Sequence, residues 1–245
     1  MSRTQILAIG VDQVTMQEAV DRCLGFLSSA EPKLVVTPNA EIAYAAAYDP
    51  ELAAIVNGAD LVIPDGAGVV LAARILGDPV PQKVAGTDLA TNLLHAMSLR
   101  KRGRVYLLGA KPEVVAAAAR RLGEQFPGIY VAGFRDGYFK PEEEAGVIEA
   151  IRRARVDVLF VGMGAPRQER WLTQHLGELN ARVSLGIGGT LDVWAGAAQR
   201  APNWMIKANL EWLFRVVKFG RYGRSLPPLA KFVLLVVLRR LRGRL

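Results

Sequence analysis

The stretch VDVLFVGMGAPRQER, residues 156–170, decides the fold, because an apolar run stops at a glycine-rich turn and a polar segment follows directly. Val, Leu and Phe dominate its first part, a composition typical of a strand buried on both faces. Gly162 and Gly164 then interrupt the run, and a helical pattern begins near Arg167. The stretch therefore predicts a strand, a tight turn and a helix in immediate succession.

The same succession recurs along most of the chain. We predict strands at residues 5–9, 34–37, 61–63, 104–108, 129–133, 156–162 and 183–186. Helical patterns lie between them, among them residues 16–28, 41–57, 112–125, 142–155 and 167–179. Strands that alternate with helices favour a parallel sheet with helices on both faces, which is a Rossmann-like α/β fold.

The positive charge of the protein is concentrated at its C-terminal end. The formal net charge is +8, but residues 201–245 hold ten of the 31 Lys and Arg and only one acidic residue, Glu211, so residues 1–200 are close to neutral. We therefore divide the chain into an α/β domain, residues 1–200, and a basic helical C-terminal appendage, residues 201–245. Pro227 and Pro228 are expected to split the appendage into two helical pieces.

Cysteine content and hydropathy indicate the compartment. Cys23 is the only cysteine, so an internal disulfide and a cysteine metal cluster are both excluded. The N-terminus resembles no signal peptide, and no apolar run approaches the roughly 18 residues of a membrane span. The run FVLLVVL, residues 232–238, is long enough to lie on a membrane but not to cross it. We expect a cytoplasmic protein with no cofactor and no protein-held metal.

Ligands of parallel α/β sheets bind beyond the carboxyl ends of the strands. Five turns follow predicted strands, namely TPNAE (37–41), PDGAG (64–68), GAKPE (109–113), GMGAPRQE (162–169) and GIGGTLD (186–192). The small residues in two of these turns, 162–169 and 186–192, either hold a phosphate through free N–H groups or only meet the geometry of a tight turn. The candidates for phosphate contact are therefore the glycines of these two turns, among them Gly162, Gly164, Gly188 and Gly189.

Polar side chains near these turns are candidates for ligand contact. Gln168 and Glu169 come directly after a glycine turn, where they can reach a base, a ribose or a sugar. Asp192 can accept a hydrogen bond from a ribose hydroxyl. Lys83, in QKVAGTDLA, is either a solvated surface charge or, if it faces the same crevice, a partner for a diphosphate.

Two of the turns carry residues with two good explanations. Thr37 or Asn39 can cap a helix that begins near residue 41, or they can contact a ligand. Asp65 can likewise cap the helix that follows it, or act as a base at the end of a strand. These residues alone do not decide between helix capping and a role in ligand contact or catalysis.

Several motifs occur here in one characteristic order. They are TPNAEIAYAA, PDGAGVV, KVAGTDL, YLLGA, VGMGAPRQERW and GIGGTLDVWAGAAQRAPNW. Together they resemble the WecG/TagA/CpsF family of bacterial glycosyltransferases, glycosyltransferase family 26, from about residue 6 to the C-terminal region. Within that family the chain is most similar to the TagA type.

The resemblance implies an enzyme that moves N-acetylmannosamine from UDP-ManNAc to the 4-hydroxyl of N-acetylglucosamine on undecaprenyl diphosphate, with inversion, for the wall teichoic acid linkage unit. It makes Asp65 the catalytic base and places Thr37 and Asn39 against the sugar or the acceptor. It also implies that Gln168 reaches the donor. By the same resemblance, three turns would line the UDP site, with Asp192 nearby. Their residues are Gly109 and Ala110, then Gly162, Met163 and Gly164, and finally Gly188, Gly189 and Thr190.

The family also places arginines of its C-terminal appendage near the active site. Arg215, Arg221 and Arg224 in EWLFRVVKFGRYGR match that pattern. Family members commonly carry Glu-Pro before the second arginine, whereas this chain has Phe219 and Gly220 and is one residue shorter. Arg215 is therefore a firmer match than the other two.

A lipid-linked acceptor implies partners beyond the donor. We expect the appendage to bind an anionic membrane surface at the inner face of the plasma membrane, and the family resemblance is compatible with a homo-oligomer. One alternative is a nucleotide-binding module with a nucleic-acid-binding tail, against which the aliphatic run 232–238 counts, so we expect no nucleic acid. A second alternative keeps the family but uses UDP-N-acetylmannosaminuronic acid as donor.

Overall fold

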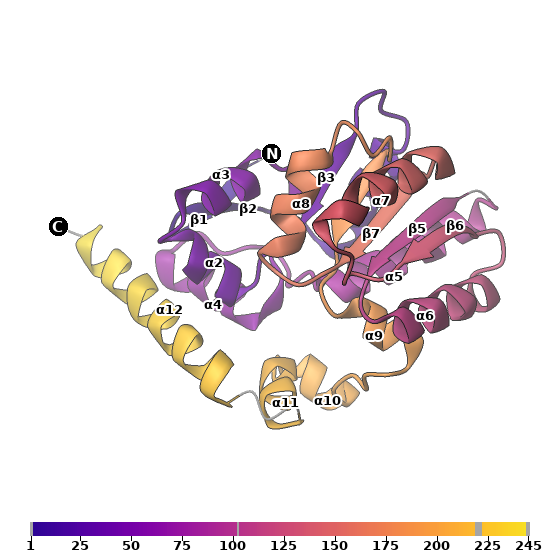
Figure 1. The fold of residues 1–245 in the computed structure, drawn as a ribbon. Coiled ribbons are helices and arrows are strands. Elements are labelled where there is room, and N and C mark those ends of the chain that lie inside the picture. The colour runs from indigo at the N-terminus through magenta and orange to yellow at the C-terminus, as the bar shows by residue number, and fades with distance from the viewer. Residues whose placement is uncertain (1, 102, 219–221, 244–245) are drawn as a thin grey trace.

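A six-stranded parallel sheet forms the centre of the protein in the computed structural model, which describes residues 2–101, 103–218 and 222–243 (Figure 1). The strand order is β4, β3, β8, β7, β5, β6, and each neighbouring pair is parallel. The strands are β3 (Lys33–Val36), β4 (Leu61–Val62), β5 (Arg104–Gly109), β6 (Tyr130–Arg135), β7 (Val158–Gly162) and β8 (Val183–Gly186). The predicted Rossmann-like sheet is confirmed.

Helices cover both faces of this sheet. Along β7, Leu159 and Val161 enter the core on one face and Phe160 enters the core on the other. The first face is covered by α2 (Ala40–Ala46), α3 (Pro50–Gly58), α4 (Gly66–Leu76), α7 (Pro141–Ala154) and α8 (Arg167–His175). The second face is covered by α1 (Met16–Phe26), α5 (Gly86–Leu99), α6 (Pro112–Gln125) and α9 (Thr190–Ala195).

The N-terminal segment forms a hairpin and not the single strand predicted at residues 5–9. Strands β1 (Arg3–Ile6) and β2 (Ile9–Asp12) are antiparallel, and Leu7 between them has a φ of +56°. Buried Asp12 joins the hairpin to the edge strand β4, since its Oδ2 accepts a hydrogen bond from the Val62 N–H at 2.7 Å. The prediction was wrong because the reversal occurs at an ordinary leucine, with no turn residue to mark it.

The helical pattern predicted at residues 41–57 is divided into α2 and α3. Asp49 caps the second helix, because its Oδ1 accepts a hydrogen bond from the Leu52 N–H at 3.0 Å. Pro50 occupies the first helical turn, where its missing N–H costs nothing. The apolar periodicity continues across this break, which is why it suggested a single helix.

The appendage forms three helices, α10 (Asn203–Lys207), α11 (Glu211–Lys218) and α12 (Tyr222–Arg242). Pro227 and Pro228 lie inside α12, so the predicted break at these prolines was wrong. The prolines remove only two N–H donors, both near the start of the helix. Packing of later residues against the domain keeps the helix continuous. That packing involves Phe232 and Val236, which are buried in the same core as residues of α2 and α4.

One face of α12 packs on the domain and the other is exposed. On the inner side, Arg240 Nη1 donates a hydrogen bond to the Leu76 carbonyl at the end of α4, at 2.9 Å. On the outer side, Leu234 and Leu241 are 58% and 56% exposed. Within the described ranges, no helix combines the length and the apolar character needed to cross a bilayer.

Candidate active site

A cavity of about 640 Å³ lies beyond the carboxyl ends of β3, β4 and β8. Four of the five turns singled out in the sequence contribute to its wall, because parallel strands deliver their following turns to one edge of the sheet. The predicted site residues that line it are Thr37, Asn39, Asp65, Lys83, Gly164, Gln168, Gly188, Gly189 and Thr190.

Thr37 and Asn39 are held by hydrogen bonds within the wall. The Thr37 hydroxyl, almost fully buried, donates to the Gly186 carbonyl at 3.1 Å. Asn39 is the N-cap of α2, and its Oδ1 accepts from the N–H groups of Glu41 and Ile42 at 2.9 and 3.0 Å. The capping interpretation of Asn39 is therefore correct. Its amide nitrogen is the part of the side chain that remains to face a ligand.

Asp65 stands at the N-cap position of α4 but does not cap it. Its backbone is extended, with φ −84° and ψ 129°, and its side chain makes no capping hydrogen bond to the helix. Gly66 follows with a φ of +83°, a conformation that glycine adopts without strain. The half-buried carboxylate lines the cavity, and its assignment as a base stays a prediction.

Lys83 belongs to the cavity and not to the outer surface. The segment that carries it is joined to the Asp65 turn, because the Val84 N–H donates to the Pro64 carbonyl at 3.0 Å. Lys83 is half-buried in the cavity wall. A cation held there can attract a phosphate of a bound nucleotide.

Gln168 faces the cavity, whereas Glu169 lies behind it. Gln168 Oε1 accepts a hydrogen bond from the Gly188 N–H at 3.1 Å, and its Nε2 donates to Glu169 Oε1 at 2.8 Å. Glu169 is only 1% exposed and does not line the cavity. Burial raises the pKa of its carboxyl. Glu169 was expected to touch a ligand, but its place in the structure makes it a support for Gln168.

Several helices begin at the cavity without a side-chain cap, among them α4, α5 and α8. The N-cap residues of α4, α5 and α8 make no side-chain capping hydrogen bond, and the first residues of these helices line the cavity. Unsatisfied N–H groups and the positive end of the helix dipole both favour an anion at such a place. The site thus combines Lys83, these helix N-termini and a carboxylate, a set suited to a phosphorylated ligand and a proton transfer.

Comparison with known proteins assigns the chain to a family. Residues 4–245 match the family model described as the glycosyl transferase WecG/TagA/CpsF family. The chain belongs to this family. Its relatives include N-acetylglucosaminyldiphosphoundecaprenol N-acetyl-beta-D-mannosaminyltransferases of Bacillus spizizenii and Staphylococcus aureus, each 34% identical. The alignments cover 86% of this chain and 81% of the Bacillus protein, and 91% and 88% in the Staphylococcus pair.

In this WecG/TagA/CpsF protein, two glycines of the predicted UDP turns are required by close backbone packing, which leaves no room for a Cβ. A Cβ on Gly109 would lie 2.3 Å from the Gly162 carbonyl oxygen, and one on Gly162 would lie 2.6 Å from that of Gly188. The three turns are thus packed directly against one another. Gly109, Gly162, Ala110, Met163 and Asp192 do not line the cavity. Their contact with UDP stays a prediction.

The appendage arginines lie partly outside the described structure. Arg221 falls outside the described residues. Arg215 belongs to α11 and Arg224 to α12, but only the helices that carry them are described and not their side chains. Their roles therefore rest on the family resemblance.

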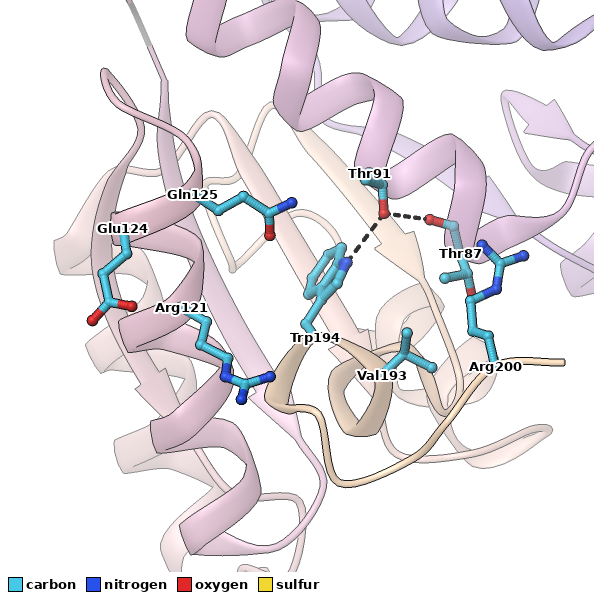
Figure 2. Close-up of a pocket in the computed structure, with 8 residues that line it drawn as sticks. All are labelled: Thr87, Thr91, Arg121, Glu124, Gln125, Val193, Trp194 and Arg200. Carbon is cyan, nitrogen blue, oxygen red and sulfur yellow. Dashed lines mark hydrogen bonds between the residues drawn. The ribbon is translucent and has the colours of Figure 1, made fainter. Parts of the chain in front are cut away.

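A second, more open cavity of about 520 Å³ lies between α5, α6 and α9 (Figure 2). Thr91 links its walls, since its hydroxyl donates to the Thr87 carbonyl at 2.8 Å and accepts from Trp194 Nε1 at 3.1 Å. Arg200, on its rim, pairs with Asp88 of α5 and approaches Glu211 of α11 within 3.7 Å. Arg200 thus connects α5 with α11 of the appendage through Asp88 and Glu211.

The sequence analysis missed an entire wall of the first cavity. Apolar residues of α4, α11 and α12 line the same cavity as the polar residues described above. They are Leu71, Trp212, Val216, Leu229 and Val233. Apolar periodicity predicts that such residues are buried somewhere, but only the docking of the appendage decides that they border the site.

Proposed function

We propose that this protein is an inverting glycosyltransferase that moves N-acetylmannosamine from UDP-ManNAc to the 4-hydroxyl of N-acetylglucosamine on undecaprenyl diphosphate, in wall teichoic acid linkage-unit synthesis. The observation that carries the proposal is the position of Asp65, a carboxylate that does not cap its helix, in a cavity with Lys83 and the uncapped N-termini of α4, α5 and α8. The names of the relatives supply the sugar and the acceptor.

In the proposed reaction Asp65 is the general base. Its carboxylate takes the proton of the acceptor hydroxyl while the oxygen attacks the anomeric carbon of the donor from the face opposite UDP. The sugar–phosphate bond breaks, the configuration inverts, and UDP departs with the bonding electrons. A base of this kind contributes about 10²- to 10⁴-fold to the rate. Thr37 and the Asn39 amide nitrogen hold the sugar or the acceptor.

The departing UDP requires compensation of its negative charge. Lys83 and the N-termini of α4, α5 and α8 supply positive potential on the cavity side. In the proposal Gln168 binds the donor, the turns near residues 109, 162 and 188 hold the nucleotide with Asp192, and the arginines at 215, 221 and 224 close the site from the appendage.

The acceptor remains in a bilayer, so the enzyme has to work at a membrane. We propose peripheral binding at the inner face of the plasma membrane through the exposed side of α12. The outer stripe of this helix, residues at i, i+3, i+4 and i+7, is formed by Leu234, Val237, Leu238 and Leu241. Exposed Arg239 and Arg242 lie beside it. An apolar stripe together with clustered cations is typical of interfacial helices.

One experiment tests the activity. The protein is incubated with a short-chain lipid-diphosphate N-acetylglucosamine and a panel of UDP-sugars, and the product mass identifies the sugar. Transfer of N-acetylmannosamine with inversion, established from the anomeric coupling in the product, is the expected result. Transfer of the uronic acid would move the protein to the other donor class, and no transfer from any donor would reject the proposal.

A further inference from the structure

The first cavity has two chemically different sides. Its polar side, built by the turns after β3, β4 and β8, holds Asp65 and Lys83. Its other side, built by α4, α11 and α12, is formed by Leu71, Trp212, Val216, Leu229 and Val233. The hydroxyls, amides and phosphates of a nucleotide-sugar gain nothing from the aliphatic side chains of this wall, although its tryptophan could also stack on a base or a sugar ring. The aliphatic part of the wall therefore suits an apolar ligand group.

The exposure of this wall supports the same conclusion. Leu71 is 47% exposed and Trp212 39% exposed, although both border a cavity. On α12, which adds Leu229 and Val233 to the wall, Phe232 and Val236 are fully buried, so this helix is well packed on the domain. Exposed large apolar side chains grouped in a concave site mark a place where apolar surface of a ligand is covered.

The apolar wall also continues to the outside of the protein. Leu229 and Val233, one helical turn apart on α12, line the cavity. The next residue, Leu234, begins the outer stripe described above. A chain molecule with its polar head beside Asp65 can thus follow apolar side chains along one helix to the exposed face of the protein.

We propose that this apolar wall, the prenyl groove, holds the first isoprene units of the acceptor's lipid chain. The inference rests on the proposed function, because it is the acceptor's diphosphate that joins the sugar to the lipid. The polar and apolar sides then correspond to the two parts of one substrate, and the groove leads its chain from the reacting sugar towards the bilayer. Binding in the groove selects lipid-linked acceptors over free sugar diphosphates.

The test compares binding and turnover of two soluble acceptors on the full-length protein, without membranes. Both carry N-acetylglucosamine diphosphate, one as the methyl ester and the other as the farnesyl ester, below its micelle concentration. Calorimetry gives the two Kd values in the presence of UDP. We expect the farnesyl acceptor to bind at least about tenfold more tightly, since even small changes in a hydrophobic pocket have effects of this size.

Matched variants locate the effect. Leu71→Asn and Trp212→Gln, both at partly exposed side chains, are expected to reduce the farnesyl-to-methyl affinity ratio about fivefold to tenfold. Leu99→Asn makes the same change at an 85% exposed leucine of α5 outside the cavity and is expected to leave the ratio at the wild-type value. Equal affinities of the wild type for the two acceptors would overturn the prenyl groove, as would a ratio unchanged in both groove variants.

The same samples separate this inference from the proposed function. When a UDP-sugar panel is added, sugar transfer without any preference for the farnesyl chain rejects the groove and keeps the glycosyltransferase. A farnesyl preference in binding without transfer from any donor keeps the groove and rejects the activity.

Discussion

Gln168 Nε2 lies 2.8 Å from Glu169 Oε1, inside the protein, while the carbonyl end of the same amide accepts from the Gly188 N–H. The amide of Gln168 is therefore fixed in one orientation. Glu169 Oε2 is buried and has no hydrogen-bond partner among the described residues. An ionised carboxylate is costly in such a place, so burial raises the pKa of Glu169 and favours its neutral form.

The raised pKa of Glu169 predicts a pH-dependent loss of stability. Between the ordinary value of 4.5 and the raised folded-state pKa, the native protein holds a proton that the unfolded chain releases. The free energy of unfolding therefore falls as pH rises through this interval, by at most about 1.4 kcal/mol per pH unit. Urea denaturation of the wild type and Glu169→Gln should show the variant gaining relative stability as pH rises. Parallel pH profiles would contradict the prediction.

Glu169 should also affect donor binding through Gln168. Glu169→Ala removes the acceptor that orients the Gln168 amide, so we expect a roughly tenfold loss of kcat/KM, mostly as a higher KM for the UDP-sugar. Glu169→Gln retains an oxygen at the same place and should restore most of the activity. Steady-state kinetics on the three proteins measure this effect. Equal KM values in the alanine and glutamine variants would exclude a positioning role.

Asp65 and Asp49 provide a matched comparison of chemistry with capping. Asp65→Ala should lower transfer by about 10²- to 10⁴-fold while UDP binding persists, because only the proposed base is removed. Asp49→Ala should preserve transfer but lower the free energy of unfolding by about 1 kcal/mol, since Asp49 caps α3. Activity assays, calorimetry with UDP and urea denaturation provide the three readouts. Full transfer by Asp65→Ala would refute its assignment as base.

Much of the fold could be predicted because local patterns and tertiary structure agree. The strand at residues 183–186 and the helix at 112–125 have the predicted bounds, since each is delimited by strong signals such as Pro112 at a helix start. The N-terminal hairpin could not be predicted, because Leu7 takes a left-handed conformation that its type does not favour. The break before Pro50 did leave a signal, Asp followed by Pro.

The candidate site was predictable as far as sheet topology determines it. Thr37, Asn39 and Asp65 follow strands whose carboxyl ends meet at one edge, so their convergence follows from the parallel sheet. Gln168 and Glu169 are neighbours at the start of α8, and only the helix phase decides which one faces the cavity. The apolar wall with Trp212 depends on how the appendage docks, which no local pattern specifies.

Arg200 should control how firmly the appendage is attached. Its guanidinium forms two hydrogen bonds with Asp88, at 2.5 and 3.2 Å, and lies 3.7 Å from Glu211. A lysine in Arg200→Lys cannot form both hydrogen bonds to Asp88. We therefore expect the free energy of unfolding to fall by about 1 kcal/mol and amide hydrogen exchange in α11 to become faster. Arg121→Lys, a change on the rim of the same cavity outside this ion pair, is the control (Figure 2). Unchanged exchange in Arg200→Lys would show that other contacts hold the appendage.

Membrane binding should depend on the outer stripe and not on the inner face of α12. Truncating the chain near residue 199 would test this poorly, because Phe232 and Val236 complete the core beside α2 and α4. The double variant with Leu238→Asn and Leu241→Asn changes exposed positions only and should weaken binding to vesicles. Arg239→Gln should weaken binding to anionic vesicles by about fivefold, near 1 kcal/mol. Co-sedimentation with anionic and neutral vesicles measures both effects, with Leu99→Asn as the control. Undiminished binding in both the double leucine variant and Arg239→Gln would place the membrane contact elsewhere on the protein.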